Sequence, residues 1–234
     1  AGEIDYFERP PGDLFKQLRV DKSIRLGRTD PFGDAVVMNI NHLHPPFNNV
    51  KARQALRYMV DQSQYVQIIA GNDGYSRPCG ALFLCGGPYE STVGAVKPDM
   101  NKAKQLLKES GYKGQKVVVL QQTNHPYYGR PAEMTIFLLR KLGVIVQVQA
   151  MDTNSLIARR YNKAPVDKGG WNIAHSGMTG IEAYTPATNF WMISSCEKAR
   201  TGWPCDARVE SLRAQWATES DPKLRKSLAE QIQK

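Results

Sequence analysis

The residues that could do chemistry lie in a few short stretches. One of these stretches places an imidazole beside a hydroxyl. His175 and Ser176 are neighbours, and a base beside a hydroxyl is the arrangement that activates a nucleophile. Neighbouring side chains on a strand point to opposite faces, so these two cannot act as a dyad. No G-x-G-x-x-G, G-x-x-x-x-G-K-[ST], G-x-S-x-G or H-E-x-x-H motif occurs. A hydrolase or transferase is therefore only an alternative, and we do not expect an enzyme.

Two histidines, His42 and His44, lie two residues apart in an extended, proline-rich passage. At this spacing both could bind one metal ion, but no third ligand follows at a useful distance along the chain. Loop histidines that bond to water or to the backbone are the commoner case. We therefore expect no metal site and no cofactor.

The four cysteines form two local pairs, Cys79 with Cys85 and Cys196 with Cys205. Both gaps are wider than the C-x₂₋₄-C spacing of zinc sites. Short-range disulfides fit this pattern better than reduced thiols, and they are typical of an oxidising compartment. On the chain-entropy estimate, each closed loop would stabilise the fold by roughly 2 to 3 kcal/mol.

Composition indicates a globular chain with a moderate excess of positive charge. Lys and Arg number 31 against 22 Asp and Glu, which gives a net charge of +9, and 41% of the 234 residues are hydrophobic. Most basic residues alternate with acidic and polar ones, as on solvated helix faces. Arg159 and Arg160, followed by Tyr161, are the nearest candidates for a nucleic-acid contact, so a nucleic-acid-binding module is a second alternative. The apolar runs are far shorter than the roughly 20 residues that span a bilayer.

Helices and strands must position the residues named above, and the hydrophobic pattern predicts that the two alternate along the chain. A strand, a helix and a strand over 116–150 predict a β-α-β unit with parallel strands, and hence a two-layer or three-layer α/β domain. The last helix follows Pro222 and has no terminating glycine, which predicts a fragment of a longer protein. Helices are expected over 13–20, 50–60, 63–70, 99–110, 131–142 and 153–161, and strands over 23–28, 35–40 (buried on both faces), 116–121, 144–150 and 171–176.

Several stretches, taken in order, resemble one known family. The chain contains PPFNNVKARQALRYMVDQ, which is similar to the signature PPF-D-N-V-x-V-R-x-A-L of extracytoplasmic solute-binding proteins for peptide-type ABC importers. This is the dipeptide and oligopeptide-binding family, or bacterial solute-binding family five. Three further segments agree with the family pattern: GEIDYFERPPGDL, KPDMNKAKQLLKESGY and GGWNIAHSGMTG.

The resemblance implies two α/β lobes that close over a ligand at a hinge. It implies a periplasmic-binding-protein-like lobe with a mixed sheet flanked by helices, truncated at both ends. Residues 1–35 would be a piece of the first lobe that leads to the hinge, and 36–176 the second lobe between two crossing strands. Residues 177–234 would hold a ligand-side turn and a helical C-terminal part. Cys196 and Cys205 also match a local disulfide of dipeptide-binding relatives.

The resemblance places ligand contacts in the turn after the strand 171–176, where a strand's carboxyl end meets a crevice. Met178, Thr179, Gly180 and Glu182 are the ligand-binding candidates, with His175 as a weaker one. Met178 stands where dipeptide binders have a tryptophan.

A second departure concerns the charge that faces the ligand. Dipeptide binders pair an Asp with the ligand's α-ammonium; this chain has Ile181 there, and Glu182 is one residue late. A buried ammonium needs a partner. The ligand therefore stays open among a peptide, an opine, a sugar oligomer and a metal chelate.

The resemblance also implies the partners and the compartment. The expected partners are a small peptide or peptide-like solute and the membrane permease subunits of an ABC importer, with no nucleic acid. We expect a monomer in the periplasm or on the outer cell surface that captures its solute by lobe closure.

Overall fold

The structure is a computed structural model that describes residues 3–8, 10, 14–28, 30–71 and 74–234. Within these ranges helices and strands alternate along most of the chain. The helices are α1 (Phe15–Val20), α2 (Val50–Met59), α3 (Gln62–Ala70), α4 (Met100–Glu109), α5 (Pro126–Leu142), α6 (Thr153–Arg160), α7 (Gly180–Ala183), α8 (Ala207–Thr218) and α9 (Pro222–Gln233). The strands are β1 (Asp34–Ile40), β2 (Val117–Gln122), β3 (Val146–Met151) and β4 (Ile173–Thr179).

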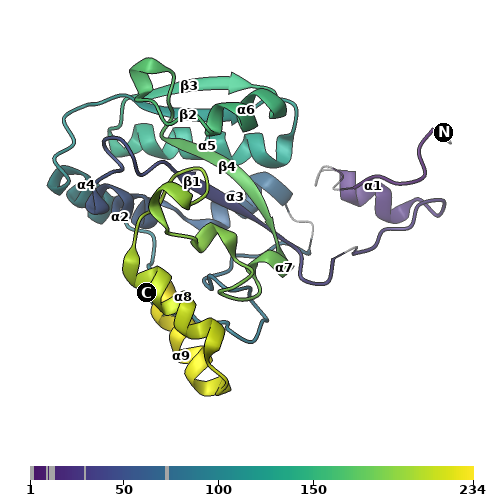
Figure 1. Ribbon diagram of the computed structural model, residues 1–234. Helices are drawn as coiled ribbons and strands as arrows, with labels where there is room; N and C mark the ends of the chain where they lie inside the picture. Colours follow the sequence, from purple (N-terminus) through teal and green to yellow (C-terminus); the bar gives the residue numbers. More distant parts are fainter. Residues whose placement is uncertain (1–2, 9, 11–13, 29, 72–73) are drawn as a thin grey trace.

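The four strands form one mixed sheet in the order β1-β4-β2-β3. β2 and β3, which α5 connects, are parallel, so the predicted β-α-β unit is confirmed. β4 is parallel to β2 and antiparallel to β1, with which it pairs along its whole length. The predicted fold class, an α/β lobe with a mixed sheet flanked by helices, is confirmed (Figure 1).

Two apolar clusters cover opposite faces of the sheet. Val117 and Val119 of β2 pack with residues of α2, α4 and α5 on one face. Val118 and Leu120 pack on the other face, with Trp203 and a leucine of α6. Because strand side chains alternate between faces, the apolar residues 117–120 of β2 contribute to both clusters. The sheet is thus the middle of three layers, as Figure 1 shows for α5 and α6.

Polar side chains cap the first turn of several helices. A side-chain oxygen accepts a hydrogen bond from a first-turn N–H and so satisfies one of the donors that lack a partner inside the helix. The capping residues of α2, α3, α4 and α9 are Asn49, Asp61, Asp99 and Asp221.

Besides the strand expected over 171–176, three predicted elements differ from the observed ones. The strand expected over 23–28 is absent, because no neighbouring strand pairs with this alternating segment. The strand expected over 35–40 lies at the edge of the sheet, and its first residues are exposed rather than buried on both faces. α5 begins at Pro126, five residues before Pro131, which lies inside the helix. A proline near a helix start removes only one internal hydrogen bond, so it does not mark the boundary.

The most important correction concerns the end of β4. The strand was expected to end at Ser176, with a turn from Gly177 onward, but it continues to Thr179. Residues 177–179 pair with Asp34–Val36 of β1, more than 140 residues away in the sequence. The predicted ligand-side turn therefore starts only at Gly180, as the short helix α7.

The described residues before β1 extend away from the sheet (Figure 1). Phe15 of α1 packs near Tyr75, with the two ring centres 6.1 Å apart. Apolar side chains earlier in this segment are exposed, including Ile4 at 69% and Phe7 at 59%. Part of the helix expected over 13–20 lies outside the described residues. The predicted domain boundaries at 35 and 176 stay predictions.

Both predicted disulfides, Cys79–Cys85 and Cys196–Cys205, are present. The second closes the loop that leads into α8. α8 and α9 form a hairpin whose interface buries Trp216. Among helices of the described ranges, none combines the length and apolar character that crossing a bilayer requires.

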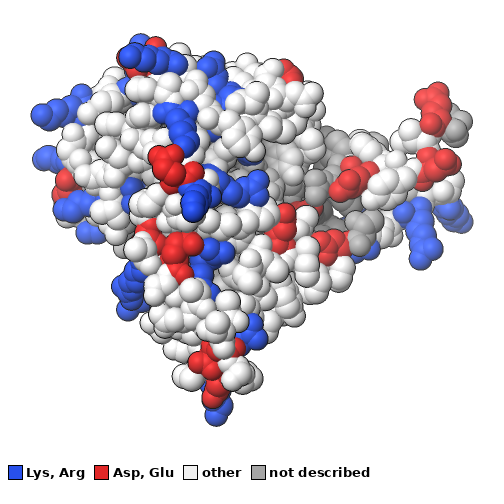
Figure 2. Space-filling view, viewed as in Figure 1, with Lys and Arg blue, Asp and Glu red and all other residues white. Residues whose placement is uncertain are grey.

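Figure 2 shows how the charges are spread over one face. Lys and Arg lie over several elements and alternate with Asp and Glu. Although the net charge of the chain is +9, the basic residues on this face do not form one continuous surface.

A chain of polar side chains connects α3, α5 and β4 inside the lobe. The Tyr65 hydroxyl lies 2.9 Å from Thr135 Oγ1, which lies 3.0 Å from His175 Nε2. His175 is only 4% exposed, and burial lowers its pKa to about 3. Its imidazole is therefore neutral in the folded protein over the whole ordinary pH range.

We expect substitution of Asn172 to destabilise the sheet. Its buried side chain accepts a hydrogen bond from Val118 N at 2.8 Å and donates one to Pro45 O at 3.2 Å. Asn172→Ala leaves a buried N–H without a partner, which should lower the free energy of unfolding by about 2 to 3 kcal/mol. Urea unfolding measures this, with the exposed Asn48→Ala as the control. Equal losses in both variants would contradict this role.

We also expect His175 to make stability depend on pH. Its folded pKa is below the ordinary value of 6.5, so its contribution is complete above pH 6.5 and decreases as the pH falls toward 3. Over that range the free energy of unfolding should fall by about 1.4 kcal/mol per pH unit for this one proton. His175→Gln should remove this slope and leave that of His42, whose pKa burial lowers to about 4. Identical slopes before and after the change would disprove the assignment.

Candidate functional site

The side chains of β4 alternate between the two faces of the sheet. His175 faces α5, where it bonds to Thr135. Ser176 faces the opposite way, and its hydroxyl accepts a hydrogen bond from Arg160 of α6. The two neighbours therefore form no dyad, as the sequence predicted.

The parallel strands end at one edge of the sheet, which we call the carboxyl edge. Gln122, Met151 and Thr179 are the last residues of β2, β3 and β4. The loops behind β2 and β3 contact each other, since Thr153 N donates to Asn124 Oδ1 at 3.1 Å. In open α/β sheets, ligands bind outside such an edge.

β4 extends past its parallel neighbour at this edge. Val119 of β2 pairs with Ile173 at the start of β4, so β2 ends about level with Ser176. Beyond that point β4 pairs with β1 alone among the described strands. The last three residues of β4, paired with the start of β1, are thus the part of the sheet that projects furthest at the carboxyl edge.

Aromatic side chains at the start of α5 lie beside this projecting end. The His125 and Tyr128 rings are 4.7 Å apart, and the Tyr127 and Tyr128 rings 5.2 Å. A Cβ at Gly177 would come within 2.3 Å of the Tyr128 hydroxyl, so a side chain at this position would displace the Tyr128 ring. Sequence reasoning missed these three residues, although a histidine and two tyrosines directly after a predicted strand were a usable signal.

Three of the predicted ligand-binding residues lie together where β4 becomes α7. Thr179 and Glu182 form a capping box, in which Thr179 N donates to Glu182 Oε2 at 2.8 Å. Gly180 N donates to Gly33 O at 2.7 Å. Part of the bonding capacity of Thr179 and Glu182 is therefore used within the chain.

The other two predicted residues point away from this cap. Met178 is 7% exposed and lies on the same face of β4 as Ser176. His175 is buried against α5. Ile181, at the position of the family's aspartate, is 51% exposed. The five candidates are therefore close along the chain, but they face different sides of the sheet.

The histidine pair is used in local contacts. His44 Nε2 lies 2.7 Å from the carbonyl oxygen of Lys163. The pKa of His42 is lowered to about 4 by burial and by the charge of Arg53. In the described part of the chain, no group of three or more His, Cys, Asp or Glu residues could hold a metal ion.

Two surface hollows lie away from the carboxyl edge. One, of about 290 Å³, is lined by residues 45–46, 48–49, 110–112 and 115, near the start of α2 and the end of α4. The other, of about 370 Å³, lies between α8 and α9. We place the candidate site at the carboxyl edge, because the direction of the strands indicates where an open α/β sheet binds ligands better than the size of a surface hollow does.

Comparison with known proteins identifies the family. Residues 1–201 match the model of the bacterial extracellular solute-binding proteins, family 5 Middle. The probable peptide ABC transporter periplasmic-binding protein y4tO of Sinorhizobium fredii is 35% identical over 100% of this chain and 45% of its own length. The glutathione-binding protein GsiB of Shigella dysenteriae is 26% identical over 97% of this chain and 45% of its own.

A solved structure shows the same fold. The ABC transporter substrate-binding protein CtaP of Listeria monocytogenes superposes with a TM-score of 0.78 at 23% identity, over 96% of this chain and 45% of that one. The chain thus spans about 45% of the length of the relatives it matches. The match over residues 1–201 shows that this chain belongs to family 5 of the bacterial extracellular solute-binding proteins.

Proposed function

We propose that the chain is part of the solute-capturing component of an ABC importer, which makes and breaks no bond. The observation that carries this proposal is the family match over residues 1–201, which includes both β1 and β4. The alternatives, a hydrolase or transferase and a nucleic-acid-binding module, have no comparable support.

The proposed mechanism is closure of two lobes over the solute. The sheet described above would be the core of the second lobe, residues 36–176, and the preceding segment 1–35 would lead to the first lobe. β1 and β4, paired along their whole length, would be the crossing strands. Closure is favoured by the difference in the solute's affinity for the closed and the open state.

The proposed compartment is the periplasm or the outer cell surface, with the permease subunits as partners. One relative is named as a periplasmic-binding protein. Two disulfides in a chain of this size also fit an oxidising compartment.

The proposed solute is a small peptide or a peptide-like molecule. The relatives are named for peptides and for glutathione, which is itself a short peptide derivative. An opine, a sugar oligomer and a metal chelate are the competing classes.

We expect the full-length protein to retain its solute through purification. Native mass spectrometry of the protein, followed by denaturation and fragmentation of the released molecule, should reveal amide-linked amino acids. A sugar or a metal chelate would overturn the proposed solute class. Turnover of a peptide or ester that Ser176→Ala abolishes would overturn the proposed transport function.

For the site, we propose that Met178, Thr179 and Glu182 contact the solute, together with the backbone of Gly180. Met178 would supply an adaptable apolar wall, Thr179 a hydroxyl donor and Glu182 a negative charge. His175 is the weakest candidate, since it is buried on the side of α5 and bonds to Thr135.

We expect Glu182→Ala to weaken binding of the retained solute about tenfold, or about 1.4 kcal/mol. Because Glu182 also caps α7, Glu182→Gln is the matched variant: it keeps an acceptor for Thr179 N but removes the charge. If the charge binds the solute, calorimetry should show a similar loss for both variants, and none for Glu230→Gln on α9. A loss confined to Glu182→Ala would reduce the role of Glu182 to capping.

A further inference from the structure

Arg160, at the end of α6, is a buried cation without a counter-charge. The residue is 8% exposed, and its guanidinium donates to the hydroxyl of Ser176 on β4. Its Nε is buried and has no hydrogen-bond partner. Among the described residues, no carboxylate lies within ion-pair distance of Arg160.

Arg213 shows the contrasting arrangement, in which a largely buried arginine has a carboxylate partner. Arg213 of α8, also largely buried, donates to both carboxylate oxygens of Glu210, at 3.0 and 3.3 Å. A guanidinium loses its hydration when it is buried in a protein. It therefore normally needs such a carboxylate partner. At Arg160 burial and the nearby charge of Arg200 both lower the pKa, which reflects the missing carboxylate.

Arg200 supplies the second cation. Its guanidinium carbon lies 3.8 Å from the ring centre of Phe190 and 4.7 Å from that of Trp191. The contact with two rings orients the guanidinium and leaves the N–H donors at its edge available. Arg200 itself is exposed, and no carboxylate of the described chain pairs with it.

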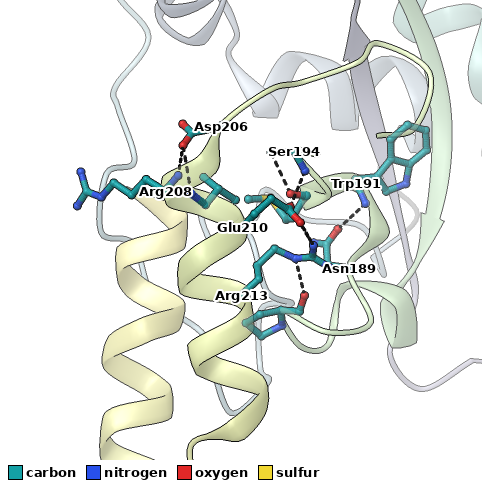
Figure 3. A network of polar contacts seen from close by, with 10 residues as sticks. Asn189, Trp191, Ser194, Asp206, Arg208, Glu210 and Arg213 are labelled. Carbon is teal, nitrogen blue, oxygen red and sulfur yellow. Dashed lines mark hydrogen bonds and ion pairs between the residues drawn. The ribbon is translucent and has the colours of Figure 1, made fainter. Parts of the chain in front are cut away.

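The loop that carries Arg200 is held firmly against the sheet. Its next residue, Thr201, accepts a hydrogen bond from Asn39 of β1 at 3.2 Å. Figure 3 shows the other end of the loop, where Asn189 accepts a bond from the Trp191 backbone and Glu210 accepts one from Ser194 N at 2.7 Å. Both arginines are therefore presented by ordered elements on the same face of β4.

We propose that Arg160 and Arg200, together with the Ser176 hydroxyl, bind a carboxylate of the captured solute. This inference rests on the proposed solute-binding function. The groups named are hydrogen-bond donors, and a guanidinium matches the planar, two-oxygen geometry of a carboxylate. Ser176 lies on the same face of β4 as Met178, two residues nearer the start of the strand, so the subsite adjoins the candidate site.

The first experiment tests the subsite with acetate as the probe. Full-length protein is freed of solute by unfolding and refolding, and its melting temperature is measured in sodium acetate against sodium chloride at equal ionic strength. Acetate should raise the melting temperature until binding saturates, and Arg160→Gln should abolish that rise. The matched control is Arg159→Gln, which removes the same charge from the next residue, whose guanidinium donates to Gly169 O.

Arg200→Gln, a change at an exposed position, is the second variant and guards against a folding defect in Arg160→Gln. It should reduce the acetate effect while leaving the melting temperature in chloride nearly unchanged. An acetate effect that is absent from the wild type, or equal in the wild type and both variants, would overturn the subsite.

The second experiment separates the subsite from the proposed function. Native mass spectrometry compares the fraction of molecules that retain a solute in the wild type, Arg160→Gln and Arg159→Gln. We expect at least a tenfold lower fraction for Arg160→Gln only, and esterification of the released solute should reveal a carboxyl group. A wild type without solute but with the Arg160-dependent acetate effect would refute the proposed function alone. Equal retention in all three would refute the assignment of this subsite to the solute.

Discussion

The position of Asn172 determines which side chains each face of the sheet presents. β2 and β4 share a single paired position, Val119 with Ile173, so the ladder alone specifies their register weakly. The buried Asn172 side chain adds a hydrogen bond to Val118 N, and the backbone of Asn172 bonds to Val118 and to Asn41. A slip of one residue would turn Ser176 toward α5 and His175 toward Arg160. Such a slip would exchange the face of β4 that carries Ser176 with the face that carries His175.

Local signals in the sequence were sufficient for much of the fold. The helices α2, α3 and α4 follow from caps and apolar spacing within ten or so residues, and the β-α-β unit follows from two apolar strands around an apolar helix. The end of β4 could not be predicted in this way. Two glycines, Gly177 and Gly180, indicated a turn. In the structure Gly177 leaves room for the side chain of Tyr128, and Gly180 is needed because the backbone of Phe32 lies against it. Both contacts come from distant segments.

The site was predictable in part. The pattern Thr179-Gly-Ile-Glu182 is a readable capping-box signature, and reading it would have shown that both residues also stabilise α7. The different fates of Arg159 and Arg160 were not readable from the sequence, where they formed one weak basic patch. On the helix they point in different directions: Arg159 donates to Gly169 O, while Arg160 reaches into the protein toward Ser176. Only the packing of α6 against β4 distinguishes them.

The charge that this lobe offers to a solute is more positive than in the dipeptide-binding pattern. Both the departures from that pattern and the arginine pair contribute to this difference. Ile181 removes the carboxylate that would pair with an ammonium, and Glu182 already accepts a bond from Thr179 N. Arg160 and Arg200 add two cations on the Ser176 face of β4. Desolvating a charge is costly unless the site supplies its opposite. With the proposed subsite, a lobe of this composition would select for the anionic end of a solute more strongly than for its cationic end. For a peptide-like solute, that end is the carboxylate.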